Sequence, residues 1–185
     1  MNIIKYIISF CIIFFAQLLY NTACANDDVN PKISRLAARI TKNCSTDYEK
    51  AFAIYQWECK NIAYDVTLNV HDGEECFKKK KGVCQAYSEL FVMIAKECGL
   101  KAKIIVGKAK VDPKSTGLRI KDNGHAWVKV KTEKGWILVD PTWGAGSVSK
   151  KKFIRSENNM SWFDVDPKWM IFTHFPDNAK NQMLH

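Results

Sequence analysis

Cys84, His125 and Asp140 are the residues whose types and order along the chain could carry nucleophilic chemistry. A thiol is a nucleophile only as the thiolate, and the amide groups at a helix N-terminus lower its pKa because they favour a negative charge. Apolar residues recur at helical spacing after Cys84, and Gly82 stands just before it, so we expect Cys84 in the first turn of a helix. An activated thiol also needs a general base and a group that orients the base. His125 and Asp140 are the candidates for these two roles.

Two runs of strand-forming residues, 125–131 and 136–140, are separated by a short polar turn and predict a β-hairpin. If the hairpin loop holds an even number of residues, His125 and Asp140 point to the same face of the sheet on a diagonal. An odd loop would place them on opposite faces. Because the even loop is the commoner solution, we expect the carboxyl group of Asp140 to lie toward the imidazole. Trp127 lies on the same face and could cover the site.

The elements that must position these residues are helices in the first half of the chain and strands in the second. Asn30-Pro31 is one helix-start signal, and Thr46 with Glu49 forms a capping box that is another. We expect helices over 30–41, 46–60 and 84–98, a loop over 65–82, strands over 101–111, 125–131 and 136–140, and an irregular tail over 162–184 with one helical turn near Trp169. This order predicts an α+β fold with an antiparallel sheet.

Residues 1–25 have the pattern of a secretory signal sequence. A positive charge, an apolar run and the A-x-A cleavage site Ala23-Cys24-Ala25 follow one another. The run is shorter than the roughly 20 apolar residues that a membrane-spanning helix needs. We therefore expect cleavage after Ala25, secretion or transfer to the periplasm, and no stable membrane insertion. Lipid attachment at Cys24 is the alternative. An N-terminal helical segment over 26–45 and one domain over 46–185 would remain.

The composition fits one globular domain with a substantial core, since the 185 residues are 47% hydrophobic and 12% aromatic. The formal net charge of +9 favours acidic partners such as envelope polymers or anionic surfaces. The basic residues are scattered apart from Lys78–Lys81 and Lys150–Lys152, and no nucleic-acid-binding motif accompanies them. We therefore expect no nucleic-acid partner.

Three motifs resemble those of the transglutaminase-like superfamily, in the same order: Gly82-Val83-Cys84, Gly124-His125-Ala126-Trp127 and Asp140-Pro141-Thr142-Trp143-Gly144. Asn61–Asp65 and Thr173–Pro176 look like the branch that holds kyphoscoliosis-peptidase-type and secreted bacterial proteins. The resemblance covers most of the chain after the predicted signal sequence. It implies a papain-like core, in which a helix that begins at the cysteine packs on an antiparallel sheet that carries the histidine and the aspartate.

The resemblance also implies roles for single residues. Cys84 would be the nucleophile, His125 the general base and later the acid, and Asp140 the group that holds the imidazole tautomer. Attack on an amide carbonyl would give a thioacyl enzyme, with its oxyanion held by the Cys84 amide and a second donor. Tyr64 is the candidate for that donor, and Trp127 is a second candidate for positioning substrate. No cofactor and no metal is implied. His174 is interpreted as structural, because no nucleophile is near it in sequence.

The remaining cysteines are expected to form disulfides after export, because thiols tend to pair outside the cell. With Cys84 in the site, Cys44, Cys59, Cys76 and Cys98 are left after removal of the signal sequence. Cys44 and Cys59 would stand about 20 Å apart at opposite ends of one helix, so they cannot pair with each other. Two pairings survive. Antiparallel packing of the second and third helices would favour Cys44 with Cys98 and Cys59 with Cys76. The cysteine spacings do not fit a zinc site.

The sequence therefore predicts an exported thiol enzyme, a monomer, that acts on amide bonds of a protein, peptide or peptidoglycan peptide. Water as the acceptor would make it a cysteine peptidase or amidase, and an amine would make it a cross-linking acyltransferase. For so small an exported domain we favour hydrolysis. The alternative is a non-catalytic module on the same fold that binds peptide or envelope polymer. The complete Cys, His and Asp set argues against such a module, which would need none of the three.

Overall fold

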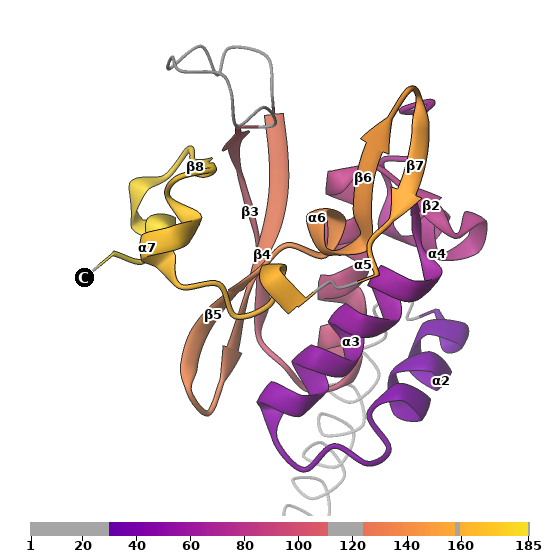
Figure 1. Ribbon diagram of the computed structural model, residues 1–185. Helices are drawn as coiled ribbons and strands as arrows, with labels where there is room; N and C mark the ends of the chain where they lie inside the picture. The colour runs from indigo at the N-terminus through magenta and orange to yellow at the C-terminus, as the bar shows by residue number, and fades with distance from the viewer. Residues whose placement is uncertain (1–29, 111–123, 158–159, 185) are drawn as a thin grey trace, which may run out of the picture. The chain divides into compact units, whose positions relative to one another are not determined.

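The computed structural model describes residues 30–110, 124–157 and 160–184 (Figure 1). One compact unit begins at Lys32 and contains the helices and strands of the fold. The predicted signal sequence, its cleavage site and Cys24 lie outside the described residues. Within the described ranges, no helix is both long enough and apolar enough to cross a membrane.

Helices make up the first half of the described chain, as the sequence predicts. α3 (Asp47–Asn61) starts at the capping box of Thr46 and Glu49, and α5 (Cys84–Glu97) starts at Cys84. α2 (Pro31–Ile40) buries its apolar face in a hydrophobic core that it shares with α3 and α5. The remaining helical segments are short: α4 (Gly73–Lys79), α6 (Pro141–Ala145), η1 (Met160–Trp162), α7 (Pro167–Met170) and η2 (Ala179–Gln182).

A four-stranded antiparallel sheet carries the second half, in the order β5-β4-β3-β8 (Figure 1). Its strands are β3 (Ala102–Ala109), β4 (Gly124–Thr132), β5 (Gly135–Val139) and β8 (His174–Pro176). Thr132 pairs with Gly135, so the β4–β5 hairpin has a two-residue loop and the expected even register is confirmed. β1 (Ala63–Tyr64) pairs parallel with β2 (Lys81–Gly82), and β6 (Gly146–Ser149) forms a hairpin with β7 (Lys152–Arg155). The predicted α+β fold is confirmed.

The prediction of a loop over 65–82 is wrong, because α4 and β2 lie within it. Asp72 caps α4 by accepting a hydrogen bond of 2.8 Å from the Glu75 amide. Ion pairs one turn apart, such as Glu74 with Lys78, follow along its exposed side. The buried side chain of this helix is Cys76. One buried side chain in seven residues gives no apolar period from which the helix could be predicted.

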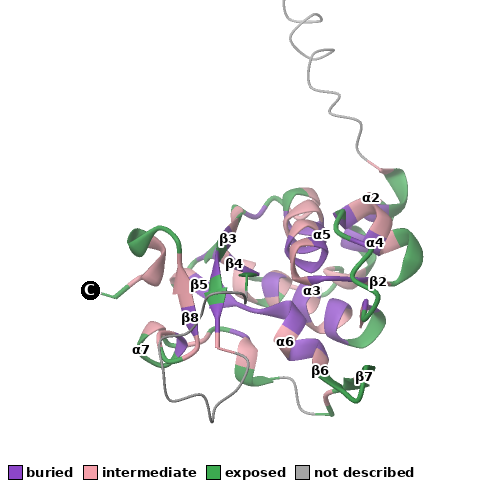
Figure 2. Ribbon diagram, turned by 90° about the horizontal axis from the view of Figure 1, so that it is seen from above, coloured by how far each residue is buried: buried purple, intermediate pink, exposed green. Residues whose placement is uncertain are grey.

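Apolar residues cover both faces of the sheet. One face joins α2, α3 and α5 in the main core cluster and contributes Val128, Val130, Ile137 and Val139. The opposite face packs against Met170 of α7 and contributes Ile105, Trp127 and Leu138. Figure 2 shows this layering from above, with α3 and α5 on one side of the strands and α7 on the other. His125 alternates with the core-facing residues of β4 and therefore lies on the Trp127 side of the sheet.

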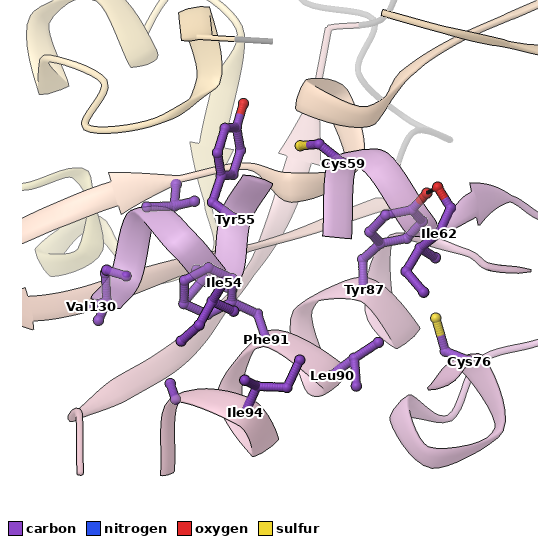
Figure 3. Packing of buried hydrophobic residues seen from close by; sticks show 14 of the residues in the cluster. Ile54, Tyr55, Cys59, Ile62, Cys76, Tyr87, Leu90, Phe91, Ile94 and Val130 are labelled. Atoms are coloured by element: carbon purple, nitrogen blue, oxygen red, sulfur yellow. Dashed lines mark hydrogen bonds between the residues drawn. The ribbon is translucent and has the colours of Figure 1, made fainter. Parts of the chain in front are cut away.

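The expected disulfides are not formed, because Cys44, Cys59, Cys76 and Cys98 are free thiols, as is Cys84. Burial raises the pKa of Cys98, and the charge of nearby Cys44 raises it further, so these two lie close together without bonding. Cys59 donates a hydrogen bond of 3.8 Å to the Pro141 carbonyl. Figure 3 shows the sulfurs of Cys59 and Cys76 pointing to different parts of the core. The pairing of Cys59 with Cys76 therefore fails on side-chain direction.

Candidate active site

Cys84 is the first residue of α5, and no side chain caps this helix. Its N-cap residue, Val83, makes no side-chain hydrogen bond to the first turn. The first amides of a helix have no intrahelical carbonyl to bond, so they favour negative charge at that end. Two residues before Cys84, Gly82 pairs with Tyr64 between β2 and β1. The position that the sequence predicts for the thiol is therefore confirmed.

His125 and Asp140 meet across the β4–β5 hairpin. The Nε2 of His125 lies 2.7 Å from Oδ2 of Asp140. Val128 pairs with Val139, so the position opposite Asp140 is Trp127, two residues along from His125. This is the diagonal, same-face relation that the even hairpin loop predicts. Since the carboxylate only accepts hydrogen bonds, Nε2 of His125 carries the proton, and Nδ1 is left for the thiol.

Asp140 is fully buried, and both of its oxygens are bonded. Oδ2 accepts hydrogen bonds from Nε2 of His125 and from Nε2 of His174, the latter at 3.0 Å. Oδ1 accepts a bond of 2.9 Å from the Trp143 amide, so Asp140 is also the N-cap of α6. Burial would raise the pKa of Asp140, but the two histidines hold it well below its ordinary range. The carboxylate therefore stays charged in its buried position.

The thiol and the imidazole are hydrogen-bonded to each other. Burial would raise the pKa of the Cys84 thiol, but this bond, the charge of His125 and a bond from the Ala126 amide lower it below its ordinary value of 9.0. Burial would lower the pKa of His125, but the charge and hydrogen bond of Asp140 raise it above 6.5, with Cys84 acting in the same direction. Both shifts favour a thiolate beside an imidazolium.

His174 completes the surroundings of Asp140, and sequence reasoning missed this. Burial keeps its pKa below 6.5, although Asp140 acts in the opposite direction, so the ring is neutral near pH 7. Its Nε2 proton is donated to Asp140, and its Nδ1 then accepts from the Thr173 hydroxyl at 2.8 Å. Three indole rings surround it, with centroids 4.6 to 5.4 Å from its own: Trp127, Trp143 and Trp162. The one signal for this residue in the sequence was its place in the Thr173–Pro176 motif.

Tyr64 and Trp127, the two candidates for oxyanion binding or substrate positioning, lie at different places relative to the cleft. Tyr64 lines the same cleft as Cys84, and burial raises the pKa of its hydroxyl, with the charge of Cys84 adding to the effect. The hydroxyl is therefore a neutral donor near the thiol. Trp127 is only 1% exposed and stacks beside His125, with ring centroids 6.0 Å apart. It lies behind the imidazole, so it supports the ring and is not placed to contact a substrate.

An open cleft of about 1530 Å³ leads to the thiol and the imidazole. One wall comes from Val66 and Leu68, and a second from the β6–β7 hairpin. Five hydrogen bonds to Asp65 hold the first wall, and they come from Thr67, Asn69, Val70 and Lys81. Ala109 at the end of β3, together with Phe172 and Thr173 in the turn after α7, contributes the third wall. The cleft is large enough for a peptide segment.

The described residues contain one group of side chains whose ligand atoms are close enough to hold a metal ion: His125, Asp140 and His174. Both imidazole Nε2 atoms lie at hydrogen-bond distance from one oxygen of Asp140. A metal at this point would have to replace the two protons that make those bonds. All three side chains are buried, and among them His125 alone lines the described part of the cleft. The donor set fits a hydrogen-bond network better than a metal site.

Three comparisons relate the chain to known proteins. The family model for the transglutaminase-like superfamily matches residues 34–141, which is more than half of the chain and contains Cys84, His125 and Asp140. Human kyphoscoliosis peptidase is 31% identical over 163 residues, which are 82% of this chain and 24% of that protein. The mouse kyphoscoliosis peptidase is also 31% identical, over 84% of this chain and 25% of its own length. The chain thus spans about a quarter of the length of these curated relatives.

Solved structures agree on the fold. A protein from Cytophaga hutchinsonii, described as a candidate cysteine protease, superposes with a TM-score of 0.51 and 22% identity, over 60% of this chain and 37% of its own. The periplasmic domain of TgpA from Pseudomonas aeruginosa gives a TM-score of 0.50 and 22% identity, over 62% and 43%. The arrangement of helices packed on an antiparallel sheet is thus shared with both. This chain belongs to the transglutaminase-like superfamily.

Proposed function

We propose that this chain is a thiol enzyme that opens amide bonds through a thioacyl intermediate on Cys84. The observation that carries the proposal is the continuous hydrogen-bond chain from Cys84 through His125 to Asp140, at the base of an open cleft. The base and the group that orients it are in place before any substrate binds. Such preorganisation is what nucleophilic catalysis requires.

In the first half of the reaction, the Cys84 thiolate attacks the carbonyl carbon and the C=O electron pair moves onto the oxygen. The Cys84 amide and the Tyr64 hydroxyl are the proposed donors to this oxyanion. When the intermediate collapses, the C–N bond breaks and His125 gives its Nδ1 proton to the leaving amine. The acyl group then remains on Cys84 as a thioester, and His125 is neutral.

In the second half, neutral His125 takes a proton from the acceptor as the acceptor attacks the thioester. Cys84 leaves as the thiolate, and the thiolate–imidazolium pair is restored. We propose water as the acceptor, because the cleft is open enough for water to reach the thioester. The name of the kyphoscoliosis peptidases supports the same choice. The proposed substrates are amide bonds of proteins, peptides or peptidoglycan peptides, whereas an amine acceptor would give cross-linking.

We also propose that the chain acts outside the cytoplasm, as a secreted or periplasmic protein. The signal-like residues 1–25 support this location. The periplasmic origin of the TgpA domain, a structural relative, is consistent with it.

The test is the pH dependence of Cys84 alkylation by iodoacetamide, with the modified residue identified by peptide mapping. We expect half-maximal reactivity below pH 9.0, the ordinary pKa of a thiol. His125→Ala should slow the reaction near neutral pH by roughly a hundredfold or more, and Asp140→Asn should slow it as well. Amide substrates with and without an added amine would then identify the acceptor.

A slow Cys84 with an ordinary thiol pKa, indifferent to both substitutions, would contradict the proposal and favour the non-catalytic binding module. Tyr64→Phe tests the second oxyanion donor separately. We expect it to slow amide hydrolysis by roughly a hundredfold. Alkylation forms no oxyanion and provides the internal comparison, since a loss of both activities together would indicate a structural role for Tyr64.

A further inference from the structure

We infer that the cleft over Cys84 selects acidic peptide segments, so that the preferred substrate carries Asp or Glu side chains near the amide bond that is opened. This inference rests on the proposed function and names the substrate class of the same site.

The cleft is lined by four basic side chains: Lys110, Lys150, Lys151 and Arg155. No Asp or Glu occurs among the described residues that line it. Walls of one sign concentrate ligands of the opposite sign and repel others, because the low-dielectric protein on either side focuses the field. An acidic substrate is therefore favoured and a basic one is disfavoured.

The lysines of the hairpin are available to a ligand. Lys150 and Lys151 are both exposed, and neither they nor Lys110 forms an ion pair with another described residue. Other lysines of this protein differ, since Lys78 and Lys79 of α4 pair with Glu74 and Glu75. The positive charge at the cleft is thus not neutralised by neighbouring side chains in the described part of the chain.

The hairpin that presents these charges is held in place. Lys150 and Lys151 form its two-residue turn with φ values of 49° and 60°, the left-handed conformation of a type I′ turn, where Asn and Gly are usual. At its base, the Arg155 guanidinium donates to the carbonyls of Cys59 and of Ile62, the latter at 3.0 Å. Figure 1 shows β6 and β7 rising beside α6. Two adjacent lysines at a constrained turn therefore present their charge at a defined place.

Apolar side chains lie between the charges. Val66, Leu68, Val148, Ile154 and Phe172 line the cleft and are 40 to 65% exposed. A small anion would leave this surface uncovered. A peptide covers it with apolar side chains while its carboxylates meet the lysines, and a cleft of about 1530 Å³ exceeds what a single small molecule fills. The occupant that satisfies both features is an acidic peptide with interspersed apolar residues.

The first test compares the alkylation of Cys84 by iodoacetate, which is anionic, with that by iodoacetamide, which is neutral, in the full chain. The quantity measured is the rate constant for iodoacetate divided by the rate constant for iodoacetamide. In Lys150→Glu/Lys151→Glu the ratio should fall by roughly three- to tenfold at low ionic strength, and added salt should reduce the difference. Lys101→Glu/Lys103→Glu is the matched control, because it makes the same charge change at exposed positions near the start of β3, whereas the cleft meets the end of that strand. The control should keep the wild-type ratio.

The outcomes separate the two proposals. If wild-type Cys84 reacts slowly with iodoacetamide, the proposed function fails. If iodoacetamide reacts fast but the ratio is the same in wild type and in both double variants, the substrate inference is overturned while the function stands. An equal fall in both double variants would show an effect of net charge and would also overturn it.

The second test measures binding without turnover, in full-length Cys84→Ala. The probes are a short dansyl-labelled peptide of alternating Glu and Leu and matched peptides with Gln or Lys in place of Glu. We expect the Glu peptide to bind at least roughly tenfold more tightly than the Gln peptide, and the Lys peptide to bind least. Adding Lys150→Glu/Lys151→Glu should remove the preference. Equal binding of the Glu and Gln peptides would overturn the inference, as would equally tight binding of an oligothymidylate, which would indicate a general polyanion site.

Discussion

Asp140 has two structural tasks, one for each carboxylate oxygen. Oδ2 accepts hydrogen bonds from His125 and His174, and Oδ1 caps α6 by accepting one from the Trp143 amide. A substitution at Asp140 therefore changes the imidazole and the helix together. A substitution at His174 removes one donor to Oδ2 and leaves the Oδ1 cap of α6 in place, so it tests the contribution of the second histidine to the orientation of the first.

His174→Leu should lower the plateau rate of Cys84 alkylation by roughly ten- to hundredfold, because Oδ2 of Asp140 loses a buried donor and no longer holds His125 at one angle. His174→Gln keeps an N–H that can reach Oδ2 and should recover part of the rate. The measurement is the pH–rate profile of each variant, with thermal unfolding as the control for stability. Equal plateau rates in wild type and His174→Leu would show that His174 has no part in positioning His125.

Glu58 is buried in α3, and neither of its carboxyl oxygens has a hydrogen-bond partner among the described residues. Burial raises its pKa well above 4.5, so the folded protein keeps it protonated. Above pH 4.5 Glu58 ionises in the unfolded chain but stays protonated in the folded one. Its ionisation therefore favours unfolding as the pH rises. Stability relative to Glu58→Gln should therefore be highest below pH 4.5 and fall above it, by at most about 1.4 kcal/mol per pH unit, until the raised pKa is reached.

Urea unfolding of wild type and Glu58→Gln at a series of pH values measures this difference. Glu58→Gln is the matched variant because it has nearly the same shape and does not ionise. Parallel stability curves for the two proteins would show that Glu58 does not ionise on unfolding in this range, contrary to the burial seen here.

At the scale of elements, the pairing of β8 with β3 decides whether His174 reaches the site. Gly107 pairs with Pro176 two positions from the pair of Ala109 with His174. A Cβ on Gly107 would collide with the backbone of Phe175 and Pro176, which cannot move away as a flexible side chain could. The absence of a side chain at this position is thus what allows the two strands to approach.

Gly107→Ala is therefore expected to destabilise the fold by about 1–3 kcal/mol and to slow Cys84 alkylation to the level of His174→Leu. The double variant Gly107→Ala/His174→Leu should then be no slower than either single variant, because both act through the same contact. Gly124→Ala is the control for stability, since an added Cβ there meets no atom of a described residue within 4 Å. An additive loss of rate in the double variant would indicate that Gly107 acts on the site by another route.

The sequence predicted the elements whose patterns are local. α3 has its capping box, α5 has an apolar period, and the β4–β5 hairpin has alternation with a short turn, so three of the site residues could be placed from spacing. α4 and β8 were missed because their stability comes from contacts made elsewhere: α4 buries Cys76 beside Gly82, and β8 pairs over only three residues. The contact of His174 with Asp140 spans 34 residues and depends on that strand, so spacing alone could not predict it.

At the scale of the whole molecule, the site is assembled from separate layers. Cys84 comes from the helical layer, His125 from the centre of the sheet, and His174 from an edge strand near α7. None of these elements holds all parts of the site. The reactivity of Cys84 therefore depends on the packing of the helices against the sheet. The other thiols report on the same packing, because it protects them from alkylation.

The five described cysteines should react with iodoacetamide in three groups, followed by peptide mapping without reductant. Cys84 should react first, because its pKa is lowered, and Cys84→Ala should remove this phase. Cys44 and Cys98 should follow slowly, since both are partly exposed but burial raises their pKa values. Cys59 and Cys76, which are buried, should react only at the rate of unfolding.

Unfolding in denaturant with the reagent present should then modify all five of these cysteines, because the structure holds them as free thiols. A disulfide would change that result in a defined way. Cys44 with Cys98, or Cys59 with Cys76, would stay unmodified as a pair until a reductant was added, while the other three reacted. Protection of either pair in the unfolded, unreduced protein would therefore restore the disulfide that the sequence predicts. Full modification would establish that the helical layer that carries Cys84 is held together by packing, without a disulfide between the described cysteines.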